Sequence, residues 1–199
     1  QQIFDTIEGD KPRVVSVIGD STFFHSGINS LLDATYNRSN LITVVLDNRI
    51  TAMTGQQENP GSGYTIAREV TEAINIETLA RALGIQNVRT INPNQLDEVN
   101  EALDWALGMD EQTVIITRWP CALKRLAPWD LEEFQGAFTE TYFVDETVCI
   151  GCRKCTRTGC PAVVFQFDKK KSSIDPDKCV GCSVCAQVCP VQAIQKVEA

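Results

Sequence analysis

Eight cysteines in the 41 residues from Cys149 to Cys189 constrain this 199-residue chain more than any other feature, and Cys121 is the ninth cysteine. Their spacing is C-x2-C-x2-C-x4-C-P, followed by C-x2-C-x2-C-x3-C-P. A disulfide framework is typical of small secreted chains, and this sequence opens with no secretory signal. Structural zinc sites use cysteines in pairs, so these triplets fit zinc poorly. Neither interpretation accounts for the repeated pattern.

The remaining interpretation is two iron–sulfur clusters, because C-x2-C-x2-C-x3-C-P is the run that binds paired [4Fe–4S] clusters in bacterial-type ferredoxins. In such proteins the fourth cysteine of each run binds the other cluster. The predicted ligands are therefore Cys149, Cys152, Cys155 and Cys189 for the first cluster, and Cys179, Cys182, Cys185 and Cys160 for the second. Thr156–Gly159 place four residues instead of three before Cys160, although Gly159 permits an unusual backbone angle. A damaged site or a three-iron cluster is the alternative there.

Charge divides unevenly along the chain. Residues 141–199 contain eight basic and six acidic side chains, a net charge of +2. Since the whole chain has a net charge of −8, residues 1–140 carry a net charge of −10. An acidic chain argues against a nucleic-acid partner, and no apolar run approaches the roughly 20 residues of a membrane span. We therefore expect a cytoplasmic protein. The basic residues near the cysteines either lie beside clusters carrying about four negative charges or, at 169–171, form a solvated hairpin turn.

The part before the cysteines has an α/β pattern. Apolar, β-branched runs at 14–18 and 41–46 predict parallel strands buried on both faces, with a helix over 27–36 between them. A helix at 76–83, a strand at 87–90, a helix at 93–107 and a strand at 113–117 continue the alternation. We expect a mostly parallel α/β domain at 1–118, a linker at 119–140 and a small α+β cluster module at 141–199.

Polar residues follow the first two predicted strands. Gly19-Asp20-Ser21 ends one strand and Asp47-Asn48 ends the next. Ligands of open α/β sheets bind at the carboxyl ends of the strands, and carboxylate and amide oxygens suit Mg²⁺, which commonly holds phosphates. This pattern predicts a metal-held diphosphate. The alternative is that Asp20 caps a helix and Asp47 opens a turn.

Two longer strings carry a family resemblance. GDSTFFHSGI from Gly19 to Ile28 and LDNRITAMTGQQ from Leu46 to Gln57 resemble the large subunit of indolepyruvate ferredoxin oxidoreductases, which also ends in a two-cluster ferredoxin domain. The spacing from Gly19 to Asn48 is similar to the thiamine diphosphate motif. The resemblance covers essentially the whole chain. It implies the C-terminal portion of a longer subunit, with a thiamine-diphosphate-binding domain that is incomplete at its N-terminus.

The resemblance also implies site residues. The Asp20 and Asn48 side chains and the Ile50 carbonyl would bind Mg²⁺, and His25 would assist substrate binding or proton transfer; otherwise this single histidine is a surface or capping residue. The residues implied to contact the cofactor are Gly19, Asp20, Ser21, Thr22, Asn48, Ile50, Met53, Thr54 and Gly55. Relatives often have histidine where this chain has Gln56, so the resemblance does not imply a proton-transfer role for Gln56. Cys121 is expected to be a buried free thiol.

The implied reaction is the oxidative decarboxylation of an aryl 2-oxo acid, with the acyl group passed to coenzyme A. Electrons would leave singly through the [4Fe–4S] clusters to a soluble ferredoxin, and a smaller β subunit would complete the complex. The alternatives are an oxidoreductase for pyruvate or 2-oxoglutarate, or a ferredoxin-type electron-transfer subunit without catalysis of its own.

Overall fold

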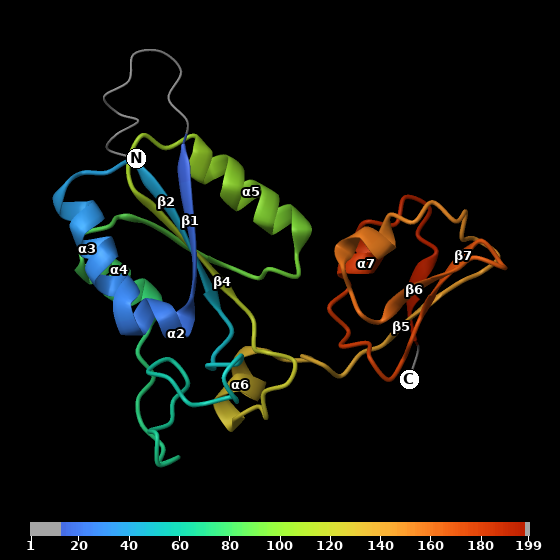
Figure 1. Ribbon diagram of the computed structural model, residues 1–199, viewed down its shortest axis with the longest axis horizontal. Helices are drawn as coiled ribbons and strands as arrows, with labels where there is room; N and C mark the ends of the chain where they lie inside the picture. Colours follow the sequence, from blue (N-terminus) through green and yellow to red (C-terminus); the bar gives the residue numbers. More distant parts are fainter. Residues whose placement is uncertain (1–12, 198–199) are drawn as a thin grey trace. The chain divides into compact units, whose positions relative to one another are not determined.

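The computed structural model describes residues 13–197, and the chain forms two compact units that meet in sequence between Arg125 and Leu126 (Figure 1). The first contains a four-stranded, fully parallel sheet in the order β1-β2-β4-β3. Its strands are β1 (Val14–Gly19), β2 (Leu41–Asp47), β3 (Asn87–Ile91) and β4 (Thr113–Arg118). The predicted parallel α/β fold is confirmed.

Helices cover both faces of this sheet (Figure 1). Residues of α3 (Ile28–Tyr36) and α4 (Ile76–Ala82) share one apolar cluster with strand residues such as Val45 and Val114. On the other face, α5 (Leu96–Leu107) packs against Ile42, Ile91 and Ile115. In the part of the chain that the structure describes, no helix combines the length and apolar character needed to cross a membrane.

The structure corrects two expectations about these elements. β1 is not buried on both faces, because Val15 and Val17 are 45% and 62% exposed at the edge of the sheet. The helix expected from Pro93 begins at Leu96 instead. Asn92 accepts hydrogen bonds from the backbone N–H groups of Asn94 and Gln95, and the resulting turn delays the helix.

The helix expected after β1 contains an irregularity that the sequence pattern does not reveal. It starts at Asp20 as α2 (Asp20–Thr22), continues as a π-helical turn, η1 (Phe23–Gly27), and then becomes α3. A Cβ at Gly27 would lie 2.7 Å from Cδ1 of Ile18, so glycine allows the helix to approach β1 closely. π-Turns occur frequently at functional sites, and this one contains His25.

The second unit contains the cysteine runs. Two antiparallel pairs frame it: β5 (Tyr142–Val144) with β8 (Ile194–Lys196), and β6 (Val163–Gln166) with β7 (Lys171–Ile174). A 3₁₀-helix, η2 (Cys155–Thr158), follows the first run, and α7 (Val184–Gln187) lies in the second. A further short helix, α6 (Pro128–Glu133), lies within the segment predicted as a linker, with its Asp130 fully buried.

Gly151→Ala is expected to destabilise this unit more than Gly159→Ala. Both glycines have left-handed φ angles, +69° and +71°, where alanine costs about 1–2 kcal/mol. A Cβ at Gly151 would also clash with the Lys170 carbonyl oxygen, whereas nothing lies within 4 Å of one at Gly159. Anaerobic thermal unfolding and the iron content per chain would measure the difference; equal losses in the two variants would contradict the role of the clash.

Candidate functional sites

Asp20 is the centre of the first candidate site, at the carboxyl edge of the parallel sheet. It follows β1 directly and is 3% exposed. Its carboxylate accepts hydrogen bonds from the Ser21 N–H at 2.7 Å and from Nδ2 of Asn59 at 3.1 Å, and the Ile50 N–H also donates to it. Burial raises the pKa of Asp20, and these neutral donors offset part of that effect. A cation at this carboxylate would favour the ionised form.

The structure brings Asn48 and Ile50 close to this carboxylate through the Ile50 N–H, whereas the prediction names the Ile50 carbonyl. Oδ1 of Asn48 accepts a hydrogen bond from the same Ile50 N–H at 3.1 Å, so both side chains meet at one backbone group. The Asn48 carbonyl accepts from the N–H of Cys121 at 3.0 Å, which ties this turn to the segment after β4. Thr51 donates through Oγ1 to Oγ of Ser21 at 2.7 Å. Asp20, Ser21, Asn48 and Ile50 therefore form one cluster of oxygen-bearing residues.

A second buried carboxylate at this edge, Asp47, has arginine partners, although its charge still adds to the raised pKa of Asp20. Nε of Arg118 donates to its Oδ2 at 2.8 Å, and the guanidinium of Arg49 lies 3.9 Å away. Arg49 also donates from Nη1 to the Gly61 carbonyl at 3.1 Å, which links the turn after β2 to the next loop. Asp47 thus has a structural role beside the site, while the donors to Asp20 are neutral groups.

Asn59 is a site residue that the sequence analysis did not identify. Its side chain is buried, donates to Asp20 across 39 residues of sequence and accepts from the Gly61 N–H at 2.9 Å. Ser62, fully buried, donates to the Asn59 carbonyl at 2.9 Å and fixes the turn. The Asn-Pro-Gly sequence indicates a turn, but no local pattern connects it with Asp20.

Other predicted residues lie on exposed parts of the same end of the sheet. The loops that follow β2 extend beyond the carboxyl ends of the strands (Figure 1). A bridge between Thr51 and Gln57 closes a small loop whose tip, Met53–Gly55, is exposed, with the Met53 side chain fully open to solvent. Thr22 and His25 are also exposed, on α2 and η1. No hydrogen bond brings Met53, Thr54, Gly55 or His25 to Asp20 in the described residues.

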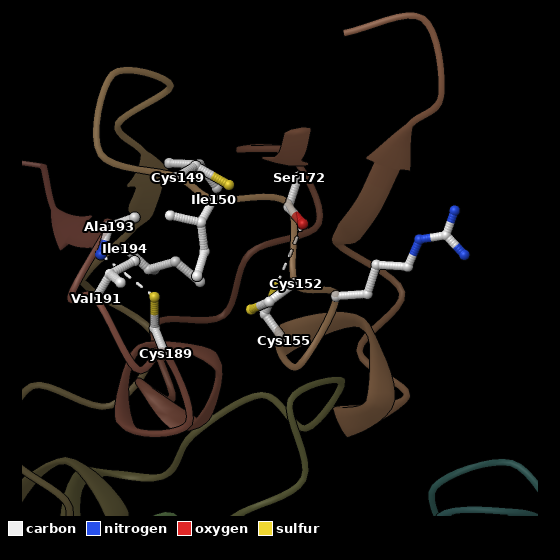
Figure 2. A pocket seen from close by; sticks show the side chains of 11 residues that line it. Cys149, Ile150, Cys152, Cys155, Ser172, Cys189, Val191, Ala193 and Ile194 are labelled. Carbon is white, nitrogen blue, oxygen red and sulfur yellow. Dashed lines mark hydrogen bonds between the residues drawn. The ribbon is translucent and has the colours of Figure 1, made fainter. Parts of the chain in front are cut away.

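The second candidate site is a cavity in the cluster unit. It is lined by the first predicted set of cysteines, together with apolar residues that include Val144, Ile150, Val191 and Ile194. Figure 2 shows the sulfur atoms of Cys149, Cys155 and Cys189 facing a common space beside Ile150. Cys155 and Ser172 are hydrogen-bonded through Sγ and Oγ at 3.2 Å, and the Ala193 N–H donates to Sγ of Cys189 at 3.3 Å.

The second predicted set also comes together. Cys160, Cys179 and Cys182 all lie close enough to Cys185 to interact with it electrostatically. Burial, with a smaller effect of these neighbours, raises the pKa of the Cys185 thiol to about 12. Thiolate is the form that binds iron, so bound iron would have to offset this preference for the neutral thiol.

The extra residue before Cys160 is accommodated by a change of helix type. The first run continues as the 3₁₀-helix η2 and ends at Gly159 in the left-handed region, whereas the second run forms the α-helical turn α7. A 3₁₀-helix is more tightly wound and rises further per residue than an α-helix. The backbone of the two runs therefore differs at the segment that contains the extra residue.

The chemistry of the first cysteine set fits a polynuclear centre. This set surrounds a cavity with sulfur donors and apolar walls. That arrangement suits a [4Fe–4S] cluster, in which each iron takes one thiolate.

Comparison with known proteins gives one family match for the part of the chain with the parallel sheet and another for the part with the cysteine runs. Residues 6–117 match the C-terminal TPP binding domain of thiamine pyrophosphate enzymes, and residues 142–196 match the 4Fe-4S dicluster domain. The chain is 43% identical over 189 residues to the indolepyruvate oxidoreductase subunit IorA of Pyrococcus horikoshii, covering 94% of this chain and 28% of that protein. It is 40% identical over 184 residues to the IorA subunit of Archaeoglobus fulgidus, covering 92% and 28%.

Among solved structures, the chain resembles a putative thiamin diphosphate-dependent enzyme from Mycobacterium smegmatis, with 25% sequence identity and a TM-score of 0.40. The match covers 54% of this chain and 18% of the chain of that enzyme. The chain spans less than a third of the length of the curated relatives named above. The family match covers more than half of the chain and includes the strand ends that carry Asp20 and Asn48. The chain therefore belongs to the thiamine pyrophosphate enzymes, with a 4Fe-4S dicluster domain after the TPP-binding domain, and it is related to the IorA subunits of indolepyruvate oxidoreductase.

Proposed function

We propose that this chain provides the diphosphate site and the electron outlet of an enzyme that oxidatively decarboxylates aryl 2-oxo acids such as indolepyruvate to acyl-coenzyme A. The observation that carries the proposal is the buried carboxylate of Asp20, whose donors are neutral and which meets Asn48 at the Ile50 N–H. A carboxylate in this state suits a divalent cation. The same chain carries two sets of four cysteines.

In this proposal the Asp20 and Asn48 side chains and the Ile50 carbonyl hold Mg²⁺. Gly19, Ser21 and Thr22 lie against the diphosphate, and the loop of Met53, Thr54 and Gly55 lies against the thiazolium ring. Bound thiamine diphosphate supplies the nucleophilic carbon and the electron sink for decarboxylation. His25, exposed on the π-turn, would hold or move a proton of the substrate.

The cysteine sets carry the redox half of the proposal. Cys149, Cys152, Cys155 and Cys189 would hold one [4Fe–4S] cluster, and Cys160, Cys179, Cys182 and Cys185 the other. Each cluster accepts one electron at a time, which suits a two-electron oxidation that delivers electrons to a one-electron carrier. We propose a soluble ferredoxin as that carrier in the cytoplasm, with coenzyme A as the acyl acceptor and a smaller β subunit as a partner.

The substrate assignment is tested by an anaerobic assay of the complete enzyme with indolepyruvate, phenylpyruvate, pyruvate and 2-oxoglutarate. Coenzyme A and a ferredoxin or dye acceptor are supplied, and formation of each acyl-coenzyme A is measured. We expect kcat/KM to be at least about tenfold higher for the aryl acids, a difference of about 1.4 kcal/mol in transition-state binding. A preference for pyruvate or 2-oxoglutarate would refute the aryl assignment while leaving the reaction type intact.

Asp20→Asn and Cys185→Ser are expected to separate the two halves of the reaction. Asp20→Asn removes the anionic oxygen at the metal, so Mg²⁺-dependent binding of thiamine diphosphate should weaken by more than the roughly 10–100-fold typical of outer-shell changes, with cluster content unchanged. Cys185→Ser should leave the cofactor bound and abolish ferredoxin reduction. Calorimetric titration and cluster spectra provide the measurements, and loss of cofactor binding in Cys185→Ser would contradict separate roles.

Asn59→Ala is expected to weaken Mg²⁺-dependent cofactor binding about 10–100-fold, because the Asp20 carboxylate would lose a buried donor that orients it. Asn100→Ala, at an exposed position of α5, is the matched control and should leave the affinity unchanged. The affinity for Mg²⁺ at saturating thiamine diphosphate is the quantity to measure. Equal affinities of the Asn59 and Asn100 variants would show that Asn59 does not position Asp20.

A further inference from the structure

The two cysteine runs differ sharply in charge. From Cys149 to Thr158 the first run contains three basic residues, Arg153, Lys154 and Arg157, and no acidic residue. The corresponding stretch of the second run, residues 179–188, contains no charged residue at all. All three basic side chains of the first run are exposed, as is Cys152, a predicted ligand of the first cluster. The two clusters would therefore present different electrostatic surfaces.

The turn between β6 and β7 adds to the basic side. Its backbone lies against the first run, since a Cβ at Gly151 would clash with the carbonyl of Lys170, and Nζ of Lys171 donates to the Cys149 carbonyl. Lys170 is exposed, and the neighbouring Lys169 is paired with Glu146 at 2.9 Å. Lys170 thus extends the basic surface of the run.

An exposed aromatic side chain lies within this surface. The Arg153 guanidinium is 4.2 Å from the ring centroid of Phe165 and 4.9 Å from that of Phe167, and the two rings meet edge to face at 5.2 Å. Phe167 is nevertheless 74% exposed. Arg153 has a left-handed φ of +62°, as does Ser183 at the corresponding position of the second run, so this angle belongs to the repeated backbone. Arginine and aromatic side chains are enriched in protein interfaces.

We propose that the basic face, formed by Arg153, Lys154, Arg157, Phe167 and Lys170, docks a small acidic electron-carrier protein. The cluster of Cys149, Cys152, Cys155 and Cys189 is then the exit cluster. One electron passes from this reduced cluster to the oxidised carrier, and no bond or proton is transferred. Docking over the exposed Cys152 keeps the tunnelling distance short. The inference rests on the proposed redox function and adds to it the direction of electron flow and the surface used.

The complete enzyme carrying Lys154→Glu and Lys170→Glu tests the proposal. The probe is an acidic two-[4Fe–4S] ferredoxin, with a small uncharged dye as the alternative acceptor. At low salt, kcat/KM for ferredoxin should fall on the order of tenfold or more, because steering of association is reversed, while dye reduction stays unchanged. Lys178→Glu, an exposed lysine beside the second run, is the matched control and should leave both rates unchanged. In the unaltered enzyme, added salt should slow ferredoxin reduction only.

Carbodiimide cross-linking supplies a measurement that needs no variant: ferredoxin carboxylates should couple to Lys154 or Lys170 and not to Lys178. Unchanged ferredoxin kinetics in the double variant, or cross-links confined to other lysines, would overturn the docking face. Parallel losses of ferredoxin and dye reduction would also overturn it, since these lysines would then act on the cluster itself. If the unaltered enzyme reduced no dye with any 2-oxo acid, the proposed function would fail instead.

Discussion

The parallel pairing of β1 with β2 is the constraint on which the diphosphate site depends. In its register Gly19 lies beside Leu46, so the residues that follow, Asp20 on one strand and Asp47-Asn48 on the other, leave the sheet at the same level. A shift of this register would separate Asp20 from the turn that carries Asn48 and Ile50. The neighbouring pairing of β2 with β4 places Arg118 beside Asp47 in the same way. Strand register thus positions Asp20 and the Asn48 turn, and Asn59 joins them from the following loop.

In the cluster unit, the arrangement of the cysteines depends on the local backbone of each run. Each proposed ligand set takes three sulfurs from one run and a fourth from the other, although the two runs differ in length by one residue. The 3₁₀-turn after Cys155 and the left-handed Gly159 take up this difference before Cys160. Gly151 and Gly181 have the same φ of +69° and the same close approach to a carbonyl, of Lys170 and Glu140 respectively. The repeated backbone is therefore preserved where the spacing is the same, and it departs where the first run is one residue longer.

Features that depend on neighbours in sequence were predictable. Apolar β-branched runs indicated β1 and β2, and the alternation of helices and strands indicated β3 and β4. The repeated cysteine spacing predicted a first set of ligands, and these four cysteines line one cavity. Features set by contacts between distant segments were not predictable. Asn59 reaches Asp20 only because the loop after β2 folds back over the edge of the sheet, and the exposure of Val15 and Val17 reflects the position of β1 at an edge. The π-turn at Phe23–Gly27 likewise depends on packing of Gly27 against β1.

Two buried carboxylates at one sheet edge differ in how the chain compensates their charge. Asp47 is 4% exposed and has an arginine nitrogen at 2.8 Å, so its charge is compensated within the chain. Asp20 is 3% exposed and is held by neutral donors, and burial raises its pKa. A carboxylate kept in such an environment is costly in its ionised form unless a cation accompanies it. The arginines satisfy Asp47 and hold the surrounding turn, which leaves Asp20 as the carboxylate at this edge that a bound cation would complete.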